Sequence, residues 1–440
     1  MKKKSLLITF FLIAVYCAAY SQERFSAAGF YSMNNSGRDV LDFNLGWRFY
    51  RGNQENAFLR TFDDQTWKLV NLPHTVELMP SEASGSRNYQ GPVWYRKHFT
   101  IDTKYESKHL SLYFEAIMGK STFYINDQKV QEHFGGFLPI IINLTQAGIK
   151  AGDEVTIAIC ADNSDDSSFP PGRKQYTMDF SVFGGIYRDC YFISTNDIHI
   201  TDANAAEKTA SGGIFVSYED VSEQKAKVNV KTHIANERFT EEKIGIETIL
   251  LDANGKKVAS SKTNLHLAAG ASGDVIQQLS VKKPALWHPD SPNLHQLKTV
   301  VYCNGKVCDG VISRIGIRSV EFRGADGLYI NGKPFEDKLM GVNRHQDYAY
   351  IGNAVPNNLH WLDVKKLRDA GCRIIRSAHY PQDPAFMDAC DELGMFVIVA
   401  TPGWQYWNPD PIFEKRIISD IRNMVRRDVI IPLLSCGNPY

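Results

Sequence analysis

The stretch that decides the fold is 372-CRIIRSAHYPQDPAFMDACDELGMFVIVA-400. "CRIIRSA" is a short apolar run typical of a buried strand, "DPAFMDACDELG" has a helical pattern, and "MFVIVA" is another buried run. Upstream, "DKLMGVN" and "NNLHWLDVKKLRDAG" form a similar pair, and "PIFEKRIISDIRNMVRRD" supplies a third helix. Strands and helices that alternate at this spacing predict βαβ units in a parallel sheet or barrel.

The first helix and strand of this region carry specific expectations. "DKLMGVN" reads as a buried strand. In the helix that follows, Leu359, Leu362 and Leu367 are expected to face the core, with the basic residues outward. A fourth strand is expected at Val429.

The N-terminal part of the chain has a different pattern. Short runs such as "SLYFEAIM", "STFYINDQKV" and "EVTIAICAD" alternate apolar and polar residues and are separated by turn residues, which predicts an antiparallel β-sandwich over residues 41–195. A second set, including "AKVNVKTHIA" and "KIGIETILLDANGKKV", predicts an immunoglobulin-like sandwich over residues 196–318.

Composition narrows the partners. Lys+Arg and Asp+Glu both number 49, so the formal charge is zero, and no basic stripe or acidic tail points to nucleic acid or to a membrane surface. A neutral partner is expected. The length of 440 residues suits about three domains.

Residues 1–21 read as a cleaved secretory signal. Lys2 to Lys4 precede an apolar run through Ala14 and the small-residue site Ala19-Tyr20-Ser21. A membrane anchor is the alternative, but the run is shorter than the ~20 residues that a span needs. We therefore expect a secreted or periplasmic bacterial protein with no membrane span after cleavage.

The eight cysteines fit no zinc pattern, and most are expected to be buried. Cys303 and Cys308 flank the hairpin-like turn "NGKV", so this pair is either bridged after export or reduced.

Polar and aromatic residues follow each strand of the C-terminal region, where βα barrels place their active sites. They offer groups that bond hydroxyls and rings that stack on a sugar. Each also has a structural interpretation: a lone histidine can be a satisfied structural residue, an aspartate can cap a loop, and a tryptophan can belong to a core. The candidates are His345, Asp347, Arg376, His379, Trp404 and Trp407.

Six motifs together resemble glycoside hydrolase family 2: "GPVWYRKHFTI", "DFSVFGGIYRD", "LWHPDSPNLHQL", "GLYINGKPF", "GVNRHQDY" and "RSAHYP". The resemblance runs from about Leu41 to Asp428. It implies a multidomain β plus α/β fold: a jelly-roll-like, sugar-binding-like sandwich over 41–195, the immunoglobulin-like sandwich over 196–318, and the N-terminal part of a TIM (β/α)8 barrel over 319–440.

The resemblance also implies residue roles. His345 and His379 match two barrel histidines that contact the sugar and stabilise the transition state. Asp179 matches an aspartate that reaches from the first domain to galactose hydroxyls, and Arg376 matches a buried arginine near the nucleophile. "RHQDY" is closer to β-galactosidase-like members than to β-glucuronidases, which tend to have Asn-Lys-His-Glu-Asp there.

The implied activity is hydrolysis of terminal β-galactosides in an oligosaccharide or polysaccharide, with retention, by two Glu residues about 5 Å apart. The alternatives are β-glucuronidase- or β-mannosidase-like activity, or a non-catalytic carbohydrate-binding remnant. Neither Glu can be named in this chain, which is expected to be inactive as written. No cofactor is certain. Family members can hold Mg²⁺ near strand four, with ligands past residue 428. The oligomeric state is left open.

The tail after Asp428 reads as a shifted reading frame. Bases that encode the family's Trp-Glu-Pro-Ile-Leu give Cys436-Gly437-Asn438-Pro439-Tyr440 and a stop when grouped one base differently. Bases for the expected Arg-Asn-His give Val429-Ile430-Ile431 in the same way. Residues 429–440 are thus expected to be frame-shifted. A natural terminus and a deliberately shortened protein are the alternatives.

Overall fold

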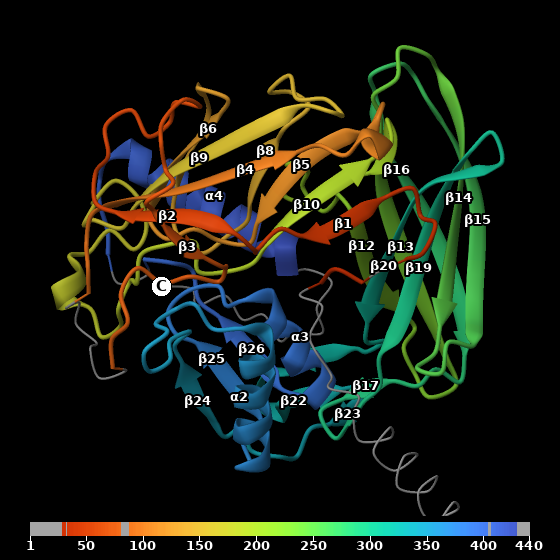
Figure 1. Ribbon diagram of the computed structural model, residues 1–440. Helices are drawn as coiled ribbons and strands as arrows, with labels where there is room; N and C mark the ends of the chain where they lie inside the picture. Colours follow the sequence, from red (N-terminus) through yellow and green to blue (C-terminus); the bar gives the residue numbers. More distant parts are fainter. Residues whose placement is uncertain (1–28, 32, 81–87, 404–405, 429–440) are drawn as a thin grey trace, which may run out of the picture.

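The computed structural model describes residues 29–31, 33–80, 88–403 and 406–428. Two β-sandwiches are followed by a small α/β part, as the sequence pattern predicts. Figure 1 shows the first sandwich above the α/β elements and the second sandwich on the right. The predictions on residues 1–21 and 429–440 lie outside the described residues.

The first sandwich consists of antiparallel sheets with strand orders β3-β2-β4-β9-β6-β7 and β1-β10-β5-β8. Its core includes Trp47, Tyr95 and Phe114, each fully buried. The strands are β1 (Asp39–Asp42), β2 (Trp47–Arg51), β3 (Lys68–Val70), β4 (Pro92–Thr100), β5 (His109–Phe114), β6 (Lys120–Ile125), β7 (Gln128–Phe134), β8 (Ile140–Asn143), β9 (Glu154–Asp162) and β10 (Cys190–Thr195).

The second sandwich packs one sheet of order β15-β14-β19-β20 on another in which β13 pairs with β11, β12 and β16. Alternate residues such as Val228 and Val230 fill its core. The strands are β11 (Ile198–Ile200), β12 (Ile214–Glu219), β13 (Lys225–Asn236), β14 (Glu242–Leu251), β15 (Lys257–Leu267), β16 (Ser272–Lys282), β19 (His295–Cys303) and β20 (Lys306–Ile315).

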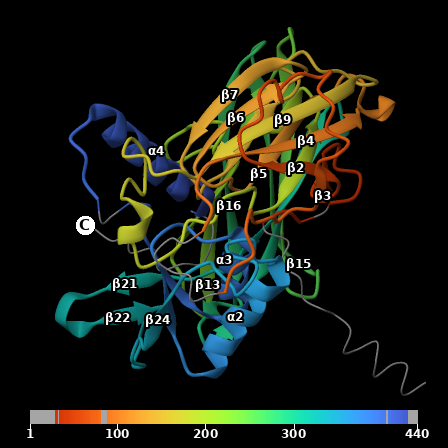
Figure 2. The same cartoon turned by 60° about the vertical axis from the view of Figure 1, so that its left-hand side comes forward.

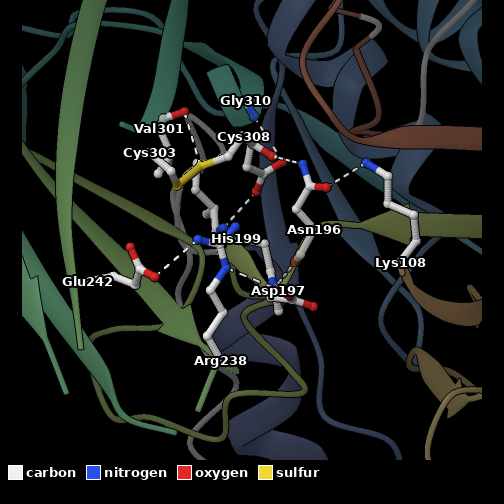
Figure 3. Close-up of a disulfide and its surroundings, with 12 residues drawn as sticks. Lys108, Asn196, Asp197, His199, Arg238, Glu242, Val301, Cys303, Cys308 and Gly310 are labelled. Carbon is white, nitrogen blue, oxygen red and sulfur yellow. Dashed lines mark hydrogen bonds and ion pairs between the residues drawn. A yellow bond between two sulfur atoms is a disulfide. The ribbon is translucent and has the colours of Figure 1, made fainter. Parts of the chain in front are cut away.

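The β19–β20 hairpin turns at Asn304 and Gly305, both of which have positive φ, as a two-residue turn requires. Cys303 and Cys308 form a disulfide across this hairpin. Figure 3 shows how the bridged tip is tied to the linker between the sandwiches: Asn196 donates to the carbonyl of Cys308 and accepts from Lys108 of the first sandwich. The bridged alternative for this cysteine pair is therefore confirmed.

After residue 316 the chain forms antiparallel hairpins and then a parallel sheet of order β24-β25-β26. The remaining strands are β17 (Trp287–His288), β18 (Ser291–Pro292), β21 (Val320–Phe322), β22 (Leu328–Ile330), β23 (Lys333–Pro334), β24 (Gly341–Arg344), β25 (Ile374–Ser377) and β26 (Phe396–Val399). The helices are α2 (Asn357–Asp369), α3 (Pro384–Leu393), α4 (Pro411–Asp428) and the 3-10 turns Thr103–Tyr105, Gln175–Thr177 and Gly324–Asp326.

Local signals set the bounds of α3. The Asp383 carboxylate accepts from the backbone N–H of Ala385 at 2.9 Å, and Pro384 occupies the first helical position. Gly394 ends the helix with φ of 68°, and a Cβ there would lie 2.2 Å from the carbonyl oxygen of Pro289. This glycine is needed both for its conformation and for the close approach.

Two expectations about this region are wrong. "DKLMGVN" is not a buried strand, because β24 pairs on one side only within the described residues, and Met340 and Val342 are exposed. Leu362 is also exposed: α2 instead buries His360 and Val364. The His360 ring accepts from Arg344, a polar contact that a hydrophobic pattern does not reveal.

Helix α4 lies against the sandwiches, behind β9 in Figure 1. Arg416 donates to the carbonyl of Ser168 at 3.0 Å, and Arg426 donates to the carbonyl of Glu207 at 2.7 Å. Among the described helices, none combines the length and apolar character needed to cross a bilayer.

Candidate carbohydrate site

Three predicted site residues converge at the ends of the parallel strands. β24 ends at Arg344 and β25 at Ser377, and these two residues are paired in the sheet, so His345 and His379 leave the same edge. Their ring centroids are 5.5 Å apart. Asp179, from the loop before β10, brings a carboxylate oxygen to 3.5 Å from His379 Nε2.

An aromatic wall that the sequence reasoning missed holds the two histidines. Phe180 stacks on His345 with centroids 5.5 Å apart and contacts His379 edge-on at 5.9 Å. Tyr380 packs on Phe180, and its hydroxyl accepts from the backbone N–H of Gln346 at 2.9 Å. Both aromatics directly follow a predicted site residue, in "DFSVFGG" and "SAHYP", and this adjacency was the available signal.

Arg376 contacts His379 directly. Its Nη1 lies 3.0 Å from His379 Nδ1, and the arginine is half-buried. Burial lowers the pKa of His379, and the Arg376 charge lowers it further, while Asp179 opposes both effects. His379 is therefore a neutral imidazole at neutral pH.

Asp347 lies on the same loop as His345. Burial raises the pKa of its carboxyl, although the neighbouring His345 and Arg344 act in the opposite direction. Its side chain is half-buried, so the loop or capping interpretation and the sugar-binding interpretation both stay predictions.

The tryptophan predictions are not tested by the geometry. Trp407 is 70% exposed. Trp404 lies outside the described residues.

A buried arginine joins the first sandwich to both site loops. Arg188, fully buried, donates to Gln346 Oε1 at 2.7 Å and to the carbonyl of Pro381 at 2.8 Å. Gln346 in turn donates to the carbonyl of Asn353, whose side chain accepts from the N–H of Phe183. The loops that carry His345 and His379 are thereby fixed against the domain that carries Asp179.

Carboxyl groups surround this arginine. Arg188 Nε is 3.6 Å from Asp383. Burial raises the pKa of Asp383 and of nearby Glu115, and it raises that of Asp189 to about 6. The charge on Arg188 partly compensates Glu115 and Asp383, so the interdomain contact depends on an intact buried ion network.

Asp179, His345 and His379 could also present ligands to a metal ion, because one ligand atom from each lies within 4.8 Å of the others. Two imidazoles and one carboxylate suit a transition metal rather than Mg²⁺. The Mg²⁺ that the family resemblance allows was expected on residues past 428, outside the described part of the chain.

The two sandwiches, the parallel sheet and a histidine pair at its carboxyl edge form the arrangement that the resemblance to a carbohydrate-active family implies. Comparison with known families identifies the family. Residues 58–196 match the glycosyl hydrolases family 2 sugar binding domain, residues 212–318 match glycosyl hydrolases family 2, and residues 320–429 match its TIM barrel domain. The chain belongs to glycosyl hydrolase family 2.

Its relatives carry two kinds of name. A β-galactosidase of Thermoanaerobacter pseudethanolicus is 32% identical over 394 residues, covering 89% of this chain and 50% of that protein. A putative β-glucuronidase of Formosa agariphila is 30% identical over 98% of this chain and 49% of that protein.

Among solved structures, Bacteroides uniformis β-glucuronidase 2, covalently bound to cyclophellitol-6-carboxylate aziridine, has a TM-score of 0.80 and 29% identity. The match covers 90% of this chain and 46% of that one. The chain thus spans about half the length of the curated relatives it matches.

Proposed function

We propose that the protein carrying this chain is a retaining exo-acting β-glycosidase that prefers terminal β-D-galactosides, and that the described residues supply its sugar-binding half. The observation that carries the proposal is the convergence of Asp179, His345 and His379 at the strand ends. A neutral His379 with a carboxylate beside it provides both a donor and an acceptor for sugar hydroxyls.

The charge of Asp179 supports a neutral sugar over a uronic acid. Its side chain is 62% exposed and lies beside His379, so a ligand bound at the histidines would meet it. Two like charges ~4 Å apart repel by about 1 kcal/mol in water and about 4 kcal/mol near a protein surface. A glucuronide carboxylate placed near Asp179 would therefore lose affinity by roughly fivefold or more relative to a galactoside.

A β-glucuronidase is the second candidate. It is favoured by relatives named β-glucuronidase, one of them solved with a 6-carboxylate inhibitor. In that case a cationic group from outside the described residues would have to compensate Asp179.

Catalysis in a retaining glycosidase requires a carboxylic acid that protonates the leaving oxygen and a carboxylate that forms the glycosyl-enzyme. We place both outside residues 29–428, so the 440-residue chain alone is proposed to bind sugar without turning it over. The shifted reading frame expected after Asp428 stays a prediction. Resequencing the gene across the Arg426 codon tests it: an additional base should open a frame with Glu at the end of strand four.

The activity test is a panel of chromogenic β-galactoside, β-glucuronide and β-mannoside, applied to the 440-residue chain and to the frame-restored protein. We expect hydrolysis only by the restored protein, with the highest kcat/KM on the galactoside. Faster hydrolysis of the glucuronide would replace the galactosidase proposal by the second candidate. Turnover by the 440-residue chain would overturn the placement of the catalytic pair. If the restored protein hydrolyses none of the three but binds glycans, the carbohydrate-binding alternative holds.

Export is proposed as well. The signal-like residues 1–21 and the Cys303–Cys308 disulfide both suit an oxidising compartment. Fractionation of producing cells should place the protein outside the cytoplasm, with Gln22 at its N-terminus. Retention of residues 1–21 in a membrane fraction would favour the anchor alternative.

A further inference from the structure

The sugar-facing trio has the composition of a transition-metal site. Two histidines and one carboxylate within 4.8 Å of one another are a ligand set that Zn²⁺ or Ni²⁺ accepts. A glycosidase that needs these groups for hydroxyls would lose them to a captured metal ion. The contact between Arg376 and His379 influences whether the trio binds a sugar hydroxyl or a metal ion.

Arg376 determines where the proton of His379 sits. A guanidinium has only donors, so at 3.0 Å from Nη1 the Nδ1 atom of His379 must accept. An accepting Nδ1 carries no proton, so the N–H of the ring is on Nε2, the nitrogen that faces Asp179 at 3.5 Å. Nε2 is then a donor and has no lone pair to offer to a metal.

A metal ion on Nε2 would reverse this arrangement. The proton would have to move to Nδ1, where it would point at a guanidinium N–H, and the ion would add positive charge close to Arg376. His345 has no such constraint, because its buried Nδ1 has no hydrogen-bond partner among the described residues. The choice between sugar and metal thus rests on His379.

We propose that Arg376 is a positioning residue that holds the His379 proton on Nε2, so that the trio donates to a sugar hydroxyl and excludes transition-metal ions. The sugar half of this statement rests on the proposed function. The metal half does not, because it concerns only residues of this chain.

The test measures Zn²⁺ affinity by competition with a chromophoric chelator at neutral pH. Arg376→Gln replaces a donor-only cation by an amide that can accept from Nδ1–H, and it should bind one Zn²⁺ about 10- to 100-fold more tightly than the native protein, the usual size of such supporting contacts. Arg376→Lys keeps a donor-only cation and should behave like the native protein. Arg373→Gln is the matched control, since Arg373 pairs with Asp290 and Asp337, away from the trio.

Two further measurements make the result decisive. Arg376→Gln combined with His379→Ala should lose the gained affinity, which locates the ion at the trio. In protein labelled with ¹⁵N-histidine, the native His379 signals should show the Nε2–H tautomer, and those of Arg376→Gln should not be restricted to it. This spectrum tests the tautomer even if a variant is too unstable for titration.

Equal Zn²⁺ affinity in the native protein and Arg376→Gln, or an Nδ1–H tautomer in the native spectrum, would overturn the inference. Either failure leaves the glycoside panel unaffected. Conversely, the zinc titration could give the expected result while the frame-restored protein hydrolyses no glycoside. The proposed function would then fail, and the role of Arg376 in excluding metal ions would stand.

Discussion

The sandwiches and the βα elements differ in how they cover their apolar surface. In the first sandwich two sheets face each other, and residues such as Trp47 and Phe114 are fully buried. In the βα part, Met340 is 65% and Val425 is 52% exposed. β24 is an edge strand of the sheet β24-β25-β26, and Figure 2 shows α4 on the side of the molecule away from β15. A sandwich closes its core by itself, whereas a parallel βα sheet needs further strands and helices on its open edge.

The largest expected effect concerns the contact of α4 with the first sandwich. Asp420 is buried there, and burial raises the pKa of its carboxyl from 3.8 to about 8. Its contribution to stability is therefore complete below pH 3.8 and is lost as the pH rises through 8. At about 1.4 kcal/mol per pH unit, the loss approaches ~6 kcal/mol over the shift from 3.8 to about 8.

The isosteric variant Asp420→Asn removes this titration and should make α4 docking independent of pH. Proteolysis within α4, measured from pH 5 to pH 9, should accelerate in the native protein and stay constant in the variant. If the rate of proteolysis depends on pH in the same way in the native protein and in the variant, the Asp420 carboxyl is solvated and α4 is not packed as described.

The next prediction compares a Trp→Ala substitution in the first sandwich with one in the βα region. Trp47→Ala removes a fully buried indole whose N–H donates to the carbonyl of Phe43, and should cost about 3–5 kcal/mol of the free energy of unfolding. Trp407→Ala removes an indole that is 70% exposed and should change stability by less than about 0.5 kcal/mol. Urea denaturation followed by near-UV circular dichroism measures both. Similar costs would mean that Trp407 is covered in solution.

A smaller effect is expected from the disulfide of the second sandwich. Cys303 and Cys308 close a short loop, which a chain-entropy estimate values at about 2 kcal/mol. Replacing both by Ser should lower the midpoint of the second-sandwich transition, and a reducing agent should have the same effect on the native protein. The double variant should then be insensitive to the reducing agent. Sensitivity in that variant would point to another bridge.

Much of the architecture was predictable because it depends on local patterns. Alternation predicted the antiparallel strands, Asn304-Gly305 predicted the hairpin turn, and "PIFEKRIISDIRNMVRRD" coincides with α4. The two sandwiches and the parallel sheet followed from the strand patterns, and the barrel was implied by the family resemblance. The convergence of His345 with His379 followed from the rule that parallel strands end at one edge.

What the sequence did not reveal depends on contacts between distant residues. Leu362 looks like a core residue by periodicity, but α2 is rotated so that His360 meets Arg344. Arg188 looks like a surface charge, although it is buried between the first sandwich and the loop at Gln346. No local pattern encodes a polar contact across 158 residues of sequence.

The smallest effect is expected from a substitution that tests whether the exposed face of α4 is solvated. Ile418, Ile421 and Val425 form an apolar stripe that is 38%, 38% and 52% exposed. Val425→Lys should change stability by less than about 0.5 kcal/mol, because the Lys ammonium reaches water from an exposed helix position. It should also reduce self-association, because it interrupts an apolar patch.

Val364→Lys on α2 is the matched control. Val364 is fully buried, so the same substitution there should abolish docking of α2 because it buries an unpaired charge. Thermal denaturation and sedimentation velocity of both variants provide the comparison. If Val425→Lys destabilises the protein as much as Val364→Lys does, a partner surface covers α4 in solution, and the contrast between closed sandwiches and an uncovered βα region fails. If Val425→Lys is neutral and less prone to associate, the stripe is solvated, and the βα region is the part of the chain whose core still requires further surface to close it.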